Sequence, residues 1–211
     1  MLAARRRNGA HPSPLTHKAL TQLTSQQHPH PAAQRMNATS TGLVSKSWAT
    51  LTAAASAQQI GMLLFHKLFV LDPRLTSLFN FATELTAADL QDGGATAPVE
   101  AMFSSPAFTD HCRSVVDAVS LAVGLLESDV GQLVQILEEL GARHVEYGVA
   151  DGDYATLLDA FLFALSAGLG GLNADLRAAW TDCLTLITKT MVTGANDARA
   201  RGVNKGGERL K

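Results

Sequence analysis

The chain of 211 residues lacks the features that mark several common protein classes. It has only two cysteines, Cys112 and Cys183, and both stand in apolar helix-like patterns without metal-ligand spacing. This scarcity excludes a disulfide-rich scaffold and indicates a reducing compartment, with a single bridge as the alternative. No run approaches the roughly 18 apolar residues of a membrane-spanning helix, so no membrane span is expected. Strand-like alternation and internal repeats are also missing, which leaves an all-α domain.

Acidic residues are absent from the start of the chain, where the first is Asp72. Residues 1–45 hold five Lys and Arg and no acid, whereas residues 46–194 hold seven basic and 17 acidic residues. Residues 195–211 hold five basic and two acidic residues. The formal net charge of −2 therefore hides an acidic body between two basic ends. An acidic body argues against nucleic acid as its partner.

The two ends differ from the body in composition as well as charge. Residues 1–39 are rich in Pro, Gln, His, Ser, Thr and Ala, without a sustained apolar period, which predicts a disordered extension. Their arginine-rich, acid-free beginning also resembles a chloroplast or mitochondrial transit peptide. The alternative is a plain disordered extension of a cytoplasmic protein, which could also lie upstream of a true start at Met36. Residues 195–211 are interpreted as a basic disordered tail. One domain over residues 40–194 remains.

Apolar residues in this domain recur at spacings of three and four, which predicts a series of helices. The pattern predicts a second helix that is apolar nearly all round and hence buried. A long connection over residues 82–102 interrupts the series. The predicted helices lie near residues 43–55, 60–69, 73–79, 106–122 and 130–144, then from a cap at Asp151 to the glycines at 168–171, and from a cap at Asn173 to Gly194.

Two histidines stand on consecutive amphipathic helices in the middle of the domain. Ser105 and Pro106 predict a helix start, as an N-cap followed by proline at the first position. His111 lies on the edge of the apolar stripe that follows, which Phe108 anchors. His144 lies four residues after Leu140 on the apolar face of the next helix. Neutral imidazoles from two facing helices are suited to be axial ligands of a flat metal macrocycle. Ordinary core packing is the alternative for each.

Seven short strings, in the right order and near the right spacing, make the domain similar to non-truncated globins, and within them to neuroglobin-like hexacoordinate globins. The resemblance implies an all-α globin fold, a three-over-three helical sandwich. The strings lie at residues 43–48 (LVSKSW), 64–69 (LFHKLF), 71–73 (LDP), 78–79 (LF), 105–113 (SPAFTDHCR), 140–149 (LGARHVEYGV) and 177–180 (RAAW).

The resemblance places His144 at the proximal haem ligand and His111 at the distal histidine. It places Phe79 where a phenylalanine stacks on the haem. The other cofactor-contacting positions that it implies are Phe65, Val115, Val149 and Tyr154. The expected cofactor is haem b, because the chain has no Cys-x-x-Cys-His attachment motif. The chain departs from the family in the longer 82–102 connection and in Ser114, where neuroglobin-like chains carry lysine.

The resemblance implies reversible binding of O₂, NO and CO, in gas or redox sensing or NO scavenging, with His111 on the iron when no gas is bound. A second hypothesis is an enzyme, an NO dioxygenase or a nitrite reductase, which would need an unknown reductase. A third is a haem-free helical sensor or interaction module, against which the presence of both histidines argues. The expected assembly is a monomer or weak dimer.

Overall fold

The computed structural model describes residues 36–82, 86–91 and 97–203, which are mainly helical and contain no strand. The predicted transit peptide, most of the predicted N-terminal extension and residues 204–211 of the predicted C-terminal tail fall outside these residues. Among the described residues, none of the helices has the length and apolar content to cross a membrane. The elements are α2 (Ala38–Ala54), α3 (Ala57–Leu71), η2 (Pro73–Leu78), η3 (Asn80–Ala82), α4 (Ala87–Gln91), α5 (Ala97–Ser104), α6 (Pro106–Ser128), α7 (Val130–Tyr147), α8 (Asp153–Gly168) and α9 (Ala174–Ala200).

Polar side chains begin several of these helices. The Asn37 side chain accepts a hydrogen bond from the Ser40 amide at the start of α2, and Asn173 caps α9 as the sequence predicts. Ser56 and Gln59 form a reciprocal capping box at the start of α3. These caps satisfy amide groups that would otherwise lack a helical partner.

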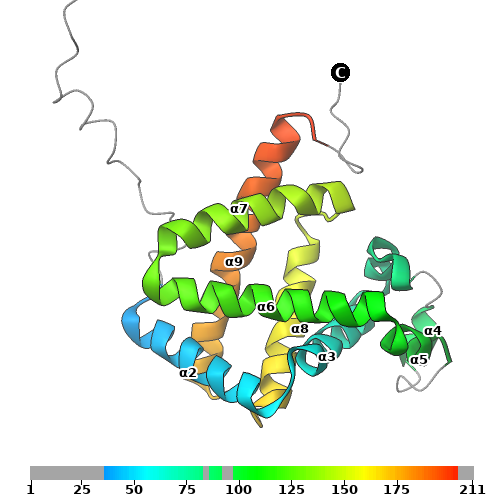
Figure 1. The fold of residues 1–211 in the computed structure, drawn as a ribbon, viewed down its shortest axis with the longest axis horizontal. Coiled ribbons are helices and arrows are strands. Elements are labelled where there is room, and N and C mark those ends of the chain that lie inside the picture. Colours follow the sequence, from blue (N-terminus) through cyan, green and yellow to red (C-terminus); the bar gives the residue numbers. More distant parts are fainter. Residues whose placement is uncertain (1–35, 83–85, 92–96, 204–211) are drawn as a thin grey trace, which may run out of the picture. The chain divides into compact units, whose positions relative to one another are not determined.

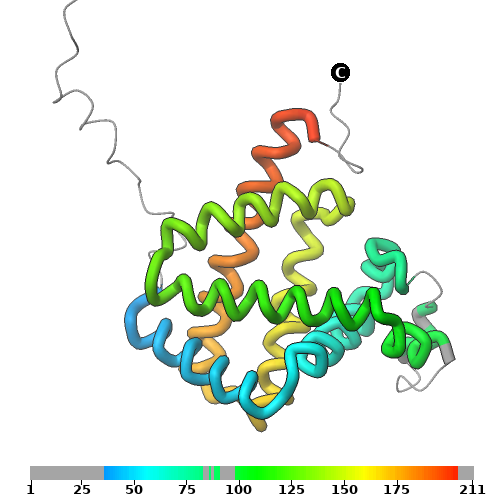
Figure 2. The backbone as a smooth tube through the Cα atoms, in the orientation of Figure 1, coloured from blue at the N-terminus to red at the C-terminus, as the bar shows by residue number. Residues whose placement is uncertain are grey.

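Six long helices form two layers (Figure 1). One layer holds α2, α6 and α7, and the other holds α3, α8 and α9. Contacts between the layers join α7 to α9, α3 to α6 and α2 to α9. The tube in Figure 2 shows α6 and α7 running across the view, with α8 and α9 behind them at a steep angle. The predicted all-α, three-over-three sandwich is confirmed.

Helices α7 and α9 make the most extensive contact of any pair, and two glycines lie where they cross. A Cβ at Gly141 would overlap the backbone of Met191, and a Cβ at Gly194 would overlap the backbone of Glu138. The two main chains therefore touch directly, without side chains between them. Because Gly141 lies one turn before His144, this contact fixes the position of the helix that carries the histidine.

The core near the start of α9 is aromatic. The Trp48 ring centroid lies 5.7 Å from that of Trp180 and 6.1 Å from that of Phe161. Trp180 is fully buried, and its indole N–H donates to the Ser47 hydroxyl at 2.9 Å. The Trp48 indole N–H donates to the Ser120 hydroxyl at 3.0 Å. Both indoles thus bury large apolar surfaces while their polar groups stay satisfied.

The structure corrects four local predictions. The 82–102 connection contains helix α4 and most of α5, and four of its residues, Ala82, Leu90, Val99 and Met102, are buried in the core. Ser105 precedes α6 as predicted, but its side chain makes no capping hydrogen bond. Asp151 does not cap α8, which begins at Asp153 after Gly152. Helix α9 continues past Gly194 to Ala200, so residues 195–200 are helical.

Candidate functional site

His144 lies in the last turn of α7, and its ring is held by the main chain of the same helix. The Nδ1 atom is 2.7 Å from the Leu140 carbonyl oxygen. A carbonyl oxygen can only accept, so Nδ1 carries the proton and donates, which leaves the lone pair on Nε2. A neutral imidazole fixed in this way is the usual form of a metal-binding histidine.

Helix α7 ends three residues after this histidine, at Tyr147. Gly148 adopts the left-handed conformation with φ of 86°, which a glycine enters without steric cost. Its amide donates to the Val145 carbonyl at 3.0 Å, and the Val149 amide donates to the His144 carbonyl at 3.1 Å. The chain therefore turns back at once and brings Val149 beside the histidine.

His111 projects from α6 into a group of aromatic rings. Its ring centroid lies 5.0 Å from that of Phe65, 5.3 Å from that of Phe79 and 5.9 Å from that of Phe81. The Phe65 ring in turn packs edge-on against Phe108 at 6.1 Å. These rings come from α3, η2–η3 and α6, so the short 3₁₀ segments complete the apolar surroundings of the imidazole.

Burial favours the neutral form of both imidazoles. Burial lowers the pKa of His111 from its ordinary value, and the nearby His144 lowers it further, so the two rings lie within electrostatic reach. Burial also lowers the pKa of His144, although the hydrogen bond to the Leu140 carbonyl opposes the shift. Neutral rings keep a lone pair available for a metal ion.

The other predicted site residues differ in their burial and in their contacts with the two rings. Phe65 is buried, and Val115 and Val149 are half-buried. Tyr154 is buried, with its ring centroid 6.3 Å from that of His144. Its hydroxyl has no hydrogen-bond partner within the described part of the chain, and burial raises its pKa to about 12. Whether these residues contact a cofactor stays a prediction.

Phe81 is a neighbour of His111 that the sequence analysis did not select. It lies next to the 82–102 connection, in a segment with no helical period, so no apolar stripe indicated its direction. The ring stacks on Phe79 at 5.2 Å and meets Phe108 edge-on at 5.2 Å. Phe108, by contrast, was predicted only as an anchor of the α6 stripe. Its side chain also belongs to the aromatic group around the histidine.

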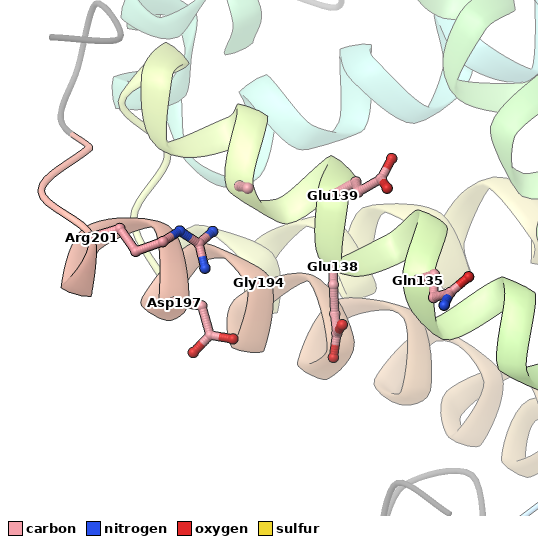
Figure 3. Close-up of a pocket in the computed structure, with 7 residues that line it drawn as sticks. Gln135, Glu138, Glu139, Gly194, Asp197 and Arg201 are labelled. Carbon is pink, nitrogen blue, oxygen red and sulfur yellow. The ribbon is translucent and has the colours of Figure 1, made fainter. Parts of the chain in front are cut away.

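A surface hollow between α7 and α9 is separate from the two histidines (Figure 3). Its lining is mostly polar, and neither His111 nor His144 belongs to it. The close approach of the two helices at Gly194 forms part of the lining. The hollow is lined by Gln135, Glu138, Glu139, Ala142, Gly194, Asp197 and Arg201.

Comparison with known proteins identifies the family of this fold. The sequence profile of the globins matches residues 63–191. The chain belongs to the globin family. Neuroglobin-2 of Oncorhynchus mykiss is 30% identical to it over 153 residues, which cover 72% of this chain and 87% of the relative. The resemblance to neuroglobin-like proteins is therefore confirmed.

Two solved structures share the fold of this globin. A hexacoordinated haem protein from an anhydrobiotic tardigrade has a TM-score of 0.65 and 17% identity, with coverage of 77% of this chain and 96% of the other. The hexa-coordinate haemoglobin of Drosophila melanogaster has a TM-score of 0.61 and 17% identity, with coverage of 83% and 100%. At these identities the two structures establish the fold.

The residues around the two histidines fit the haem that the globin family implies. The fit rests on the groups that could bind the iron. Because the Nδ1 proton of His144 is bonded to the Leu140 carbonyl, its Nε2 atom is unprotonated and can bind a metal ion. His111 is a second neutral imidazole within electrostatic reach of the first. Phe65 and Phe79 beside His111, together with the half-buried Val149, provide apolar surroundings that suit an apolar macrocycle. Both the axial donors and the apolar surroundings are thus present.

Proposed function

We propose that this globin holds haem b between α6 and α7 and binds diatomic gases, O₂, NO and CO, with His111 as the sixth ligand when no gas is present. Haem supplies an iron with two axial positions for imidazole or gas. The observation that carries the proposal is the pair of neutral imidazoles, with the His144 Nδ1 proton committed to the Leu140 carbonyl.

The two helices contribute residues with different roles. His144 presents Nε2 as the proximal ligand, and the bond to Leu140 keeps its ring from rotating. His111 either provides the competing nitrogen or, when displaced, donates a hydrogen bond to the gas. Phe65 and Phe79 pack on His111 and exclude water from the distal side. Water exclusion slows oxidation of the metal.

Internal competition explains the role that we propose, gas or redox sensing or NO scavenging. A site that His111 occupies most of the time is open only in a fraction of molecules, and the apparent gas affinity falls by that fraction. Such a protein responds to gas by exchanging one ligand for another. This exchange suits sensing and scavenging better than bulk oxygen transport. The neuroglobin relatives and the hexacoordinate structures of the same fold support this assignment.

The test compares three full-length variants after reduction without oxygen. Wild-type protein should give the absorbance spectrum of low-spin, six-coordinate haem, and CO binding limited by His111 dissociation. His111→Leu should give a five-coordinate spectrum and faster CO binding, by about 10- to 100-fold. His144→Ala should lose or misligate the haem.

His66→Leu is the matched control, because His66 is half-buried on α3 and its ring faces Phe103 at 5.9 Å. It should leave both the spectrum and the CO rate unchanged. A five-coordinate spectrum in the wild-type protein would contradict the assignment of His111. Equal haem retention in His144→Ala and wild type would contradict the proximal assignment.

A further inference from the structure

The end of α9 joins the chain segment that follows the proximal histidine. Arg199 Nη1 donates to Asp151 Oδ1 at 2.7 Å, and Nη2 donates to the Val149 carbonyl at 3.0 Å. Nη1 also donates to Asn196 Oδ1 at 3.0 Å. One guanidinium thus connects the last helix to two residues of the loop between α7 and α8. Bonds of this charge-assisted kind are stronger than those between neutral groups.

Apolar contacts accompany these hydrogen bonds. Val145, the residue after His144, packs with Ala195 and Ala198 of α9 in a small buried cluster. Val203, three residues beyond the end of α9, packs on the same cluster. The last two turns of α9 and the residues just after them therefore lie against the end of the proximal helix.

All the α9 residues in this contact lie outside the globin match, which ends at residue 191. They belong to the part of the chain that the sequence analysis assigned to a disordered tail. The contact therefore involves residues beyond those that the globin profile matches.

Residue 149 links the contact to the histidine. Its amide donates to the His144 carbonyl at 3.1 Å, and its own carbonyl accepts from Arg199 at 3.0 Å. A short chain of hydrogen bonds therefore runs from α9 through the main chain of Val149 to the backbone of the proximal residue.

We propose that Arg199 is a positioning residue of the proximal side, which holds the loop after α7 so that His144 and Val149 keep one geometry toward the haem. The inference rests on the proposed haem binding and adds a role for the end of α9. The side chains of Arg199 and Asp151 are 35% and 46% exposed, so solvent weakens their ion pair. The hydrogen bond from Arg199 to the Val149 carbonyl distinguishes this contact from an isolated ion pair on the surface.

The test uses the full-length ferric protein for haem transfer and the CO complex of the reduced, ferrous protein for spectroscopy. Arg199→Ala should speed haem transfer to excess apomyoglobin by about fivefold. It should also shift and broaden the iron–histidine stretching band recorded by resonance Raman directly after CO photolysis. That band reports the geometry of His144 alone, because the sixth position is then empty.

Two further variants keep the test informative if Arg199→Ala folds poorly. Arg199→Lys retains the charge but cannot bond to Asp151 and Val149 with a planar fork, so it should give an intermediate rate. Asp151→Asn leaves the Val149 bond intact and should have the smaller effect. Arg177→Ala, a change of the same charge at an exposed position of the same helix, should match the wild type.

Three results would overturn the inference. One is a haem-transfer rate for Arg199→Ala equal to that of the wild type. Another is a faster rate with an unchanged iron–histidine band and a matching loss of apoprotein stability, since that pattern indicates only a structural role. The third, a wild-type protein that takes up no haem, would contradict the proposed function itself and is therefore distinguishable from the first two.

Discussion

Replacing Gly141 with alanine tests the direct contact between α7 and α9. The added Cβ would overlap three main-chain atoms of Met191, and main-chain atoms cannot turn aside as a flexible side chain does. One helix must therefore move. Overpacking of this kind costs about 1–3 kcal/mol, from which a gain of about 0.5–1 kcal/mol in helix propensity must be subtracted. Because the obstacle is backbone, we expect the upper part of the range, a net loss of about 2 kcal/mol.

Gly124 provides a matched control in the opposite direction. It lies on an exposed face of α6, and an added Cβ would have no atom within 4 Å. Gly124→Ala should therefore stabilise the protein by about 0.5–1 kcal/mol through helix propensity alone. The same chemical change thus has opposite signs at two helical positions, and the difference comes only from what the new methyl group meets.

Urea unfolding followed by far-ultraviolet circular dichroism measures both variants. A loss of about 2 kcal/mol lowers the midpoint by about 1 M, for a slope typical of a domain this size. Since Gly141 lies three residues before His144, the displaced helix should also change the absorbance spectrum of the haem-bound protein. A Gly141→Ala protein as stable as Gly124→Ala would refute the reasoning, because it would show that the two helices separate at no cost.

Two other predictions concern buried polar groups. Ser47→Ala removes the acceptor of the fully buried Trp180 N–H and should lower the free energy of unfolding by about 1–3 kcal/mol, whereas Ser128→Ala at an exposed position should change it little. Burial raises the pKa of Cys112 and of Cys183 from 9.0 to about 12, so both thiols should resist a thiol reagent at pH 8 until urea unfolds the chain. Unfolded thiols ionise near pH 9 while the folded ones stay protonated, so the free energy of unfolding should fall as the pH rises above about 9. Rapid labelling of the native protein at pH 8 would contradict the expected protection of the two thiols.

Periodicity predicted those parts of the fold that depend on neighbours along the chain. Stripes at three and four residues located the long helices, and the Asn173 cap is a local signal that the structure retains. The segment before α6 was harder to predict, because α4 and α5 are short and Val99 and Met102 become core residues only through contacts with distant helices. Glycine also misled the analysis, since Gly194 read as a helix end but serves a helix crossing.

The candidate site was predictable to a similar extent. His111 and His144 stood out because each flanks an apolar stripe, and the family resemblance then assigned their roles. Asp151 read as a helix cap from local sequence, although it pairs with Arg199, 48 positions further along. No spacing rule connects two such residues. Interactions of this kind depend on tertiary geometry, which a single sequence does not display.

The hydrogen bonds that orient His144 are made by main-chain atoms. This limits how strongly the orientation of the ligand depends on the neighbouring side chains. The Leu140 carbonyl holds the ring and the Val149 amide holds the backbone carbonyl of the histidine. Neither bond depends on the side chain at position 140 or 149. Substitutions around the ligand can therefore accumulate, in evolution or in design, without altering its tautomer, provided that residues 140–147 stay helical and position 148 keeps its left-handed turn. In this globin, a main-chain carbonyl fixes the tautomer and orientation of the histidine, a role that a carboxylate side chain has in many metalloproteins.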